Sequence, residues 1–251
     1  MPESRRGFVW GLVAAHAATH GGRVSVADVC AVAVSSAQVG GVWVAVASGR
    51  GPDFVMCVTD PVSEQLAEVQ LMLGEGPCHD VLATAAPVLA GDLGDDQPGR
   101  RWPGFTAEAR QLGAGAVFAF PLMIGAIRAG VMGLYRASPG PLPGAQLGDC
   151  LLLADAATVL LLDGLDHGVA GAAGGDGAGL GGQSPDLALH RAEVDQATGM
   201  LTVQLGVSAA EAFARLRAYA YGQDRRLADV ASDIVARRLR LDPDPASSGG
   251  P

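Results

Sequence analysis

Apolar residues in the first two thirds of the chain follow two different spacings. At three- and four-residue steps they predict helices over residues 8–20, 25–38, 61–73, 102–112 and 146–166. In short runs rich in β-branched residues they predict strands over residues 39–47, 54–59, 87–93, 116–124 and 127–135. Short turns separate the first two strands and the last two, so each of these pairs predicts a β-hairpin. Residues 1–166 are therefore expected to form an α+β domain, with an antiparallel sheet flanked by helices.

The last fifth of the chain has a helical pattern throughout. Within residues 187–241, three segments each carry an apolar stripe, and Gly206 and residues 222–224 separate them. Ser208 and Glu211 have the spacing of a capping box, in which two side chains satisfy free backbone groups at a helix start. Each stripe needs an apolar partner, so the three segments predict a compact three-helix bundle.

Two further stretches have the composition of chain without a packed core. Residues 167–186 are mostly glycine and alanine, which predicts a flexible linker between the two domains. Residues 242–251 are rich in proline, serine and glycine and predict a disordered tail. We therefore expect a domain over residues 1–166, a linker over 167–186, a second domain over 187–241 and a tail.

The composition supports two domains and an uneven distribution of charge. With 251 residues, 49% of them hydrophobic and 17% charged, the chain can bury one sizeable core and a small second one. A net charge of -9 argues against diffuse nucleic-acid binding by the whole molecule. All 17 basic residues are arginine, and eight of them follow Asp186. Arginine favours planar contacts to phosphates or bases, although acidic residues lie among these arginines, as on a solvated helix face.

The cysteines bear on metal binding, and the N-terminus bears on export. The four cysteines lack a CxxC pair, so we expect no metal site and small buried thiols in a reducing compartment. Arg5 and Arg6 precede a short apolar run, as in a twin-arginine export signal. His16 and His20 interrupt that run, which instead predicts an amphipathic helix. We expect no membrane span and a cytoplasmic protein.

Three motifs in the C-terminal segment carry a resemblance to a known family. The sequences QATGML (196–201), AFARLR (212–217) and RLADVA (226–231) together resemble an ANTAR domain. The resemblance implies binding of paired RNA hairpins in leader transcripts, so that an antiterminator forms and polymerase reads on. Thr198 departs from the family, which commonly has lysine or arginine there. The expected RNA-binding residues are Arg191, Gln196, Thr198, Gly199, Arg215, Arg217, Tyr219, Arg225, Arg226 and Arg237.

The order of elements in the N-terminal domain resembles a GAF domain. A glycine-rich segment, residues 74–78, lies between a helix and a strand, and two hairpin strands follow at 120–122 and 130–134. The sequence signature of cyclic-nucleotide GAF domains is not visible, so no cyclic nucleotide is expected. Five residues are candidates for ligand or redox sensing: Gly74, Glu75, Gly76, Cys78 and His79.

Each of these sensor features has a structural alternative. Glycine permits close backbone approach, and a helix N-terminus at Cys78 would favour its thiolate; the alternative is a tight turn with a buried cysteine. A pocket lined by large side chains is a second candidate, with ordinary core as its alternative. The side chains concerned are Trp43, Phe54, Phe118, Phe120 and Met132.

These observations together predict a regulator without enzymatic activity or cofactor. Its expected partners are RNA hairpins, an unknown small-molecule or redox signal, and a second copy of the chain, because residues 146–166 are apolar on more than one side. One alternative is a GAF-fold thiol enzyme of the free methionine sulfoxide reductase type, which would need Cys57, Cys78 and Cys150 to converge. Another is the same sensor with a DNA- or protein-binding helical output.

Overall fold

The computed structural model of the chain describes residues 2–47, 52–171, 185–223 and 225–241. The chain divides into two compact units, Met1–Ser184 and Pro185–Pro251, and each is described by itself. The predicted tail and the centre of the predicted linker, residues 172–184, lie outside the described residues.

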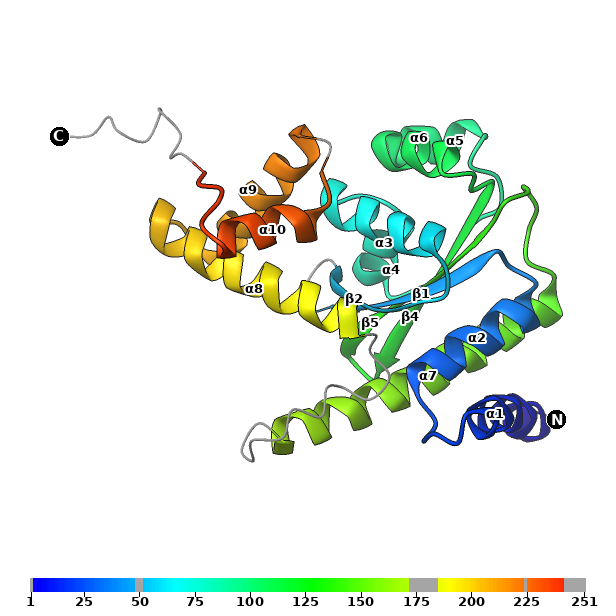
Figure 1. Cartoon of the computed structure of the whole chain (residues 1–251). Helices are drawn as coiled ribbons and strands as arrows, with labels where there is room; N and C mark the ends of the chain where they lie inside the picture. The colour runs from blue at the N-terminus through cyan, green and yellow to red at the C-terminus, as the bar shows by residue number, and fades with distance from the viewer. Residues whose placement is uncertain (1, 48–51, 172–184, 224, 242–251) are drawn as a thin grey trace. The chain divides into compact units, whose positions relative to one another are not determined.

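The N-terminal unit is built on a five-stranded antiparallel sheet with strand order β2-β1-β5-β4-β3 (Figure 1). The strands are β1 Gly41–Ala47, β2 Pro52–Val58, β3 Val88–Ala90, β4 Ala116–Ile124 and β5 Ile127–Arg136. β1 pairs with β2 and β4 with β5, which confirms both predicted hairpins. The helices of this unit are α1 Pro2–Thr19, α2 Val26–Ala37, α3 Pro61–Leu73, α4 Pro77–Thr84, α5 Asp96–Arg101, α6 Pro103–Gln111 and α7 Gly144–Gly171.

Helices cover both faces of the sheet, so every inner strand is buried on two sides. α2 and α7 pack on one face, while α3 and α4 pack on the other (Figure 1). β1 shows the result directly, because all seven of its residues are buried. Val42 and Val44 point into the core under α2 and α7, and Trp43 points into the core under α3 and α4. The predicted mixed α+β architecture is confirmed.

Trp43 requires a glycine on the neighbouring strand. It lies opposite Gly133 of β5, where a Cβ atom would come within 2.1 Å of the Trp43 ring. No heavier residue fits beneath the indole, so this pair fixes the register of the two central strands.

The start of α3 is set by Asp60. Its carboxylate accepts hydrogen bonds from the backbone N–H groups of Val62 and Ser63 at 2.9 and 3.1 Å, and Pro61 occupies the first helical turn. The Tyr135 hydroxyl of β5 donates to the same carboxylate at 3.1 Å. Burial by itself would raise the pKa of Asp60, but these hydrogen bonds together with those from the Ser63 and Thr59 hydroxyls outweigh it and lower the pKa.

α1 begins with the two arginines that resemble an export motif. Arg5 donates to both carboxylate oxygens of Asp149 in α7, at 2.7 and 2.5 Å, and Arg6 pairs with Asp155 of α7 at 2.9 Å. Val9 and Val13 of α1 are buried in the core under α2 and α7. The arginine pair therefore belongs to the packing of α1 against α7.

α7 closes the N-terminal unit. Its helical backbone continues to Gly171, five residues past the predicted end at Asp166 and into the predicted linker. One segment of it, Gly144–Asp163, is long and apolar enough to cross a membrane by length and composition. Cys150, Leu153 and Ala157 on this segment are buried in the core beside α2 and the sheet. This is the arrangement of a core helix.

The C-terminal unit consists of α8 Pro185–Leu205, α9 Ala209–Gly222 and α10 Leu227–Val235, which pack on one another. The predicted three-helix bundle is confirmed, and its stripes meet inside: Ala197, Leu201, Ala212, Leu216, Ala220, Leu227, Val230, Ala231 and Ile234 are buried. The predicted capping box is only half formed. Ser208 accepts from the Glu211 N–H at 3.2 Å, but the Glu211 side chain pairs with Arg215 at 2.7 Å. This ion pair engages the carboxylate that the box required.

Candidate functional site

A groove in the C-terminal unit runs between α8 and the segment that follows α10. It has a volume of about 870 Å³. The chain turns after α10 at Arg237, whose φ is 58°, and the side-chain amide of Gln204 in α8 donates to the Leu241 carbonyl. This return of the chain forms the second wall. The groove is lined by Gln196, Gly199, Met200, Val203, Gln204, Ile234, Arg237, Leu239 and Arg240.

The groove offers cationic, amide and apolar groups together. Arg237 and Arg240 are exposed, and neither forms an ion pair with another described residue. Val203 is 86% exposed, although it lies on a packed helix. At Gly199 a Cβ atom would meet nothing within 4 Å, so the backbone of α8 is open to a ligand there. We name this surface the α8 groove.

Two of the predicted RNA-binding arginines, Arg225 and Arg215, form ion pairs within the C-terminal unit. Arg225 donates to Asp233 at 2.6 Å, and Arg238 donates to the other oxygen of the same carboxylate at 2.7 Å. The two guanidinium groups lower the pKa of Asp233, and the Asp233 side chain in turn raises the pKa of Arg225. Arg215 pairs with Glu211 on its own helix. These pairs compete with any contact to phosphate.

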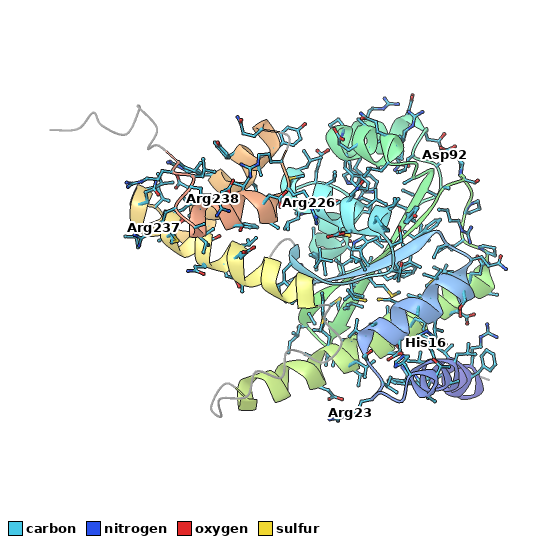
Figure 2. All side chains as sticks on the ribbon, in the orientation of Figure 1. His16, Arg23, Asp92, Arg226, Arg237 and Arg238 are labelled. Atoms are coloured by element: carbon cyan, nitrogen blue, oxygen red, sulfur yellow. The ribbon has the colours of Figure 1, made fainter. Side chains whose placement is uncertain are left out.

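The remaining predicted RNA-binding residues differ in exposure and in the contacts that they make. Arg217 is half-buried above the Phe213 ring, 5.3 Å from its centroid, and burial lowers its pKa. The Thr198 hydroxyl donates to the Val194 carbonyl at 2.8 Å, within α8. Arg226 is exposed at the start of α10, at the opposite end from Arg237 and Arg238 (Figure 2). Tyr219 is half-buried, and the Arg191 side chain lies outside the described residues.

The structure thus brings three of the ten predicted residues into the α8 groove: Gln196, Gly199 and Arg237. The sequence prediction missed Arg240, Gln204 and Val203 as groove residues. Val203 carried a signal, because it is an apolar residue outside the stripe formed by Ala197 and Leu201. The others depend on the return of the chain after α10, which no spacing rule predicts.

In the N-terminal unit, the glycine-rich segment forms a tight connection between α3 and α4. Gly74 ends α3 with φ 69°, and Gly76 precedes α4 with φ 125°. The backbone N–H of Cys78 donates to the Gln70 amide oxygen at 2.8 Å, and Glu75 accepts from the Phe105 N–H at 2.8 Å. His79 contacts the Gln70 carbonyl at 2.9 Å. All these groups are engaged with the protein itself.

Cys78 lies in the first turn of α4, as expected, but its thiol is fully buried. Burial raises its pKa to about 12, against smaller opposing effects of Trp43 and Gln70. This is the reverse of the shift that a helix N-terminus alone would produce. The space around it, lined by Trp43, Ala45, Phe54, Val55, Ala67, Gln70, Leu71 and Cys78, does not admit a water molecule.

The predicted aromatic pocket does not form, because the sheet separates its members. Phe118, Phe120 and Met132 belong to the core under α2 and α7, whereas Trp43 belongs to the core on the other face. The same division applies to the cysteines. Cys57 and Cys150 lie on one face and Cys78 on the other, so the convergence that a thiol enzyme of the methionine sulfoxide reductase type requires is absent among them.

A different pair of thiols does meet. Cys30 of α2 and Cys57 of β2 are both buried in the same core, and each thiol shifts the pKa of the other. That contact, with burial, raises the pKa of Cys30 well above its usual value, and it lowers the pKa of Cys57. The sequence contained no signal for this pair, since the two cysteines are 27 positions apart on separate elements.

Comparisons with known proteins agree with this architecture. The sequence model of the ANTAR domain matches residues 188–235. The N-terminal unit is similar to the GAF domain of a phosphoenolpyruvate-protein phosphotransferase from Coxiella burnetii, with a TM-score of 0.50 and 12% identity, covering 65% of this chain and 98% of that one. The Acinetobacter counterpart gives a TM-score of 0.47 and 13% identity, covering 64% of this chain and 98% of that one.

A third similar structure is the GAF-B domain of DevS from Mycobacterium smegmatis, with a TM-score of 0.41 and 22% identity, covering 57% of this chain and 93% of that one. Comparison with curated proteins gives no match. The N-terminal unit thus has the GAF fold, and residues 188–235 match the sequence model of the ANTAR domain.

Proposed function

We propose that the ANTAR domain binds RNA hairpins through the α8 groove and thereby promotes transcription antitermination, in the cytoplasm. The GAF-fold unit controls this activity in response to a small ligand or to redox state. The observation that carries the proposal is the α8 groove itself, in which two guanidinium groups without an ion-pair partner among the described residues flank amide side chains and exposed backbone.

The groups in the groove suit a folded RNA. Arg237 and Arg240 present planar cations that can bind phosphates in a bidentate manner. Gln196 and Gln204 can donate to and accept from base edges or ribose hydroxyls, as unpaired loop bases require. Val203 provides an apolar surface on which a base can pack. The domain therefore combines sequence-independent phosphate contacts with groups able to discriminate bases.

The predicted RNA-binding residues outside the groove remain part of the proposal. Arg226 is exposed and extends the cationic surface beyond the groove. Arg215 and Arg225 must exchange a carboxylate for a phosphate in order to contribute, so we assign them a smaller share of the affinity. Arg191, Arg217, Thr198 and Tyr219 complete the proposed set.

Redox state is the form of signal for which the N-terminal unit offers defined groups. Cys30 and Cys57 lie in the same core and shift each other's pKa, and oxidation of the two thiols by one peroxide would give a disulfide and two waters. Such a bond would link α2 to β2 within the core. The segment 74–79 stays the candidate for a ligand-dependent form of the signal.

A homodimer is the proposed assembly. Leu151 and Val159 on the outer side of α7 are 42% and 45% exposed, and Phe8 of α1 is 56% exposed. Large apolar side chains in such positions on core helices are typical of surfaces that pair. A dimer would present two ANTAR domains, one for each hairpin of a pair.

The function is tested by transcription in vitro. Crosslinking the protein to cellular RNA supplies its leader sequences, and these are placed before their own terminators. We expect the wild-type protein to increase read-through and the Arg237→Ala/Arg240→Ala variant not to. The proposal is contradicted if the wild-type protein does not increase read-through. If it then also binds duplex DNA as tightly as hairpin RNA at the same salt concentration, the helical output acts on DNA instead.

A further inference from the structure

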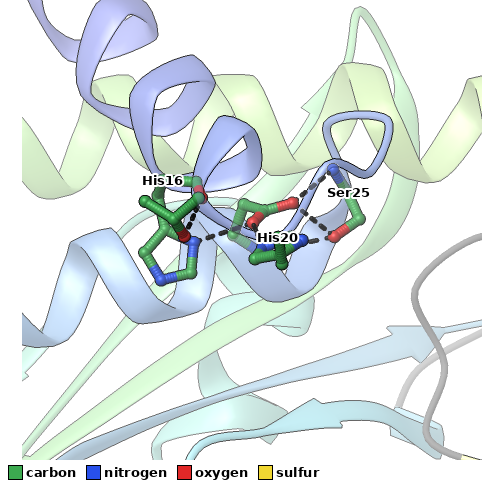
Figure 3. Close-up of polar contacts among 5 residues, drawn as sticks. His16, His20 and Ser25 are labelled. Atoms are coloured by element: carbon green, nitrogen blue, oxygen red, sulfur yellow. Dashed lines mark hydrogen bonds and ion pairs between the residues drawn. The ribbon is translucent and has the colours of Figure 1, made fainter.

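Three side chains of the N-terminal unit converge where α1 ends and α2 begins. The Nδ1 atom of His16 lies 2.7 Å from the Oδ1 atom of Asp28, and the Nε2 atom of His20 lies 2.8 Å from the same oxygen (Figure 3). The three potential ligand atoms all lie within 4.8 Å of one another. Two imidazole nitrogens and one carboxylate oxygen are thus close enough together to bind one ion.

Local structure explains the convergence. His16 and His20 are four residues apart in and just after the last turn of α1, so their side chains project from the same face. Gly21, with φ 66°, then reverses the chain toward Ser25, the N-cap of α2. Asp28 is the third residue of α2, and the turn brings it beneath both rings.

The carboxylate is fixed through Oδ2, the oxygen that does not face the two imidazoles. The Oδ2 atom of Asp28 accepts from the Ser25 N–H at 2.9 Å and from the Ser25 hydroxyl at 2.7 Å. The bond from the Ser25 N–H, together with the bond that the Asp28 N–H donates to the Ser25 hydroxyl oxygen at 3.4 Å, forms the capping box of α2, and Oδ1 is directed toward the two histidines. Metal-binding carboxylates are commonly fixed by outer hydrogen bonds of this kind.

Asp28 is also enclosed. Its side chain is 1% exposed, and Ser25, His16 and His20 all make hydrogen bonds to its carboxylate. The side chains of His16 and His20, in contrast, are 41% and 51% exposed, so the cluster is accessible to solvent from the side of the histidines. Water can therefore reach a cation at this point and complete its coordination.

We propose that His16, His20 and Asp28 form a binding site for a divalent transition metal ion, for which Zn²⁺ is the probe. The ligand atoms are Nδ1 of His16, Nε2 of His20 and Oδ1 of Asp28. Two imidazole nitrogens with one carboxylate oxygen are a donor set that zinc accepts, with solvent in the remaining position. This site is independent of the RNA-binding proposal, since it lies wholly in the other unit.

Binding requires a small rearrangement. A tetrahedral zinc ion with bonds near 2.0–2.1 Å separates its ligand atoms by roughly 3.3 Å, so each ring withdraws by about half an ångström. Each imidazole nitrogen that faces Asp28 in the metal-free protein carries a proton and donates a hydrogen bond to the carboxylate. A neutral imidazole can move that proton to its other nitrogen, and the exposed rings have room to do so. The metal then replaces two hydrogen bonds with two coordinate bonds.

The competing explanation is a hydrogen-bonded latch between α1 and α2 that never binds metal. Glutamine separates the two explanations, because its side-chain amide can still donate to Asp28 but is a poor zinc ligand. His16→Gln and His20→Gln therefore retain the latch and remove the metal site. His79→Gln is the matched control, since His79 is a described histidine outside the cluster, in contact with Gln70.

The experiment is calorimetric titration of Zn²⁺ into the metal-stripped full-length protein. We expect one saturable site per chain in the wild type and in His79→Gln. Each cluster variant should weaken it by roughly 100-fold or more, and Ser25→Ala, which loosens the outer support, by about 10-fold. Saturating Zn²⁺ should also raise the melting temperature of the wild type but not of the double glutamine variant.

A second measurement keeps the proposal testable if a cluster variant fails to fold. Co²⁺ bound to the wild-type protein should give the weak visible bands of nitrogen and oxygen ligands, without the intense near-ultraviolet band of a thiolate ligand. Absence of a saturable site in the wild type, equal affinity in the double glutamine variant, or a thiolate band from the cysteines would each overturn the proposal.

Discussion

The side-chain amide oxygen of Gln70 accepts a hydrogen bond from the backbone N–H of Cys78 at 2.8 Å. Gln70 is fully buried in α3, and its amide nitrogen donates to the Leu66 carbonyl at 3.3 Å. At Gly76 a Cβ atom would come within 2.6 Å of Gln70 Cγ, so the glycine lets the segment pass closely over this side chain. The glycines that resemble a ligand-binding loop therefore have a clear structural task.

We expect Gln70→Leu to destabilise the N-terminal unit. Leucine fills a similar volume but leaves the buried Cys78 N–H without its acceptor, which costs about 1–3 kcal/mol. Urea denaturation followed by circular dichroism measures the difference. Gln65→Leu on the exposed side of the same helix is the control, and an equal effect of the two substitutions would contradict this role for Gln70.

Cys78 should be unreactive in the folded protein. With its pKa raised to about 12, the thiol is only about 0.01% ionised at pH 8, and it is buried as well. Cys57 should react first, since the hydrogen bond from Cys30 lowers its pKa. Alkylation at pH 8, mapped by mass spectrometry, tests this order. Rapid modification of Cys78 before unfolding would restore it as a redox-active group.

The charge of Asp60 should make stability depend on pH. Its pKa is lowered in the folded state, so its contribution is present above the unfolded pKa of about 3.9 and is lost as the pH falls through the lowered folded value. Asp60→Asn keeps the shape and removes the charge. The wild type should therefore be more stable than this variant near neutral pH, with the gap closing in acid. A gap that is constant with pH would contradict the assignment.

Gly199→Leu should separate RNA binding from folding. A Cβ atom at Gly199 meets nothing within 4 Å, and leucine has a higher helix propensity by roughly 0.8 kcal/mol, so the domain should melt at an equal or higher temperature. The new side chain nevertheless occupies the α8 groove and should weaken hairpin binding. Gly222→Ala at the end of α9, outside the groove, is the comparison variant. Undiminished binding by Gly199→Leu would move the RNA surface elsewhere.

Most elements of both units were predictable, because their signals are local. The apolar period placed most of the predicted helices within a few residues of those observed. α4 and α5 were not among the predicted helices, and the six residues of α5 carry no apolar stripe. Side-chain partners were less predictable, since they depend on contacts between distant elements. Neither the ion pairs of Asp233 nor the Cys30 and Cys57 contact could be read from spacing.

The candidate RNA site shows the same division. The ANTAR-like motifs fall inside the matched segment 188–235, and the arginines of α9 and of the segments on either side of α10 were apparent from the sequence. The groove could not be predicted, because residues 237–241 form its wall by folding back on α8 through Gln204. The histidine and aspartate cluster was missed for a related reason. In the sequence, His16 and His20 are polar interruptions of an apolar run. Their closeness to Asp28 depends on the turn at Gly21.

The most direct test of the central claim is the affinity of the full-length protein for a leader hairpin, measured by fluorescence anisotropy over a range of salt concentrations. Arg237→Ala/Arg240→Ala should weaken binding and lower the salt slope by about 1–2, because two phosphate contacts are lost. Arg100→Ala, an exposed arginine of the N-terminal unit, should change neither quantity. Equal affinity and equal salt slope for the double variant and the wild type would contradict the α8 groove as the RNA-binding surface.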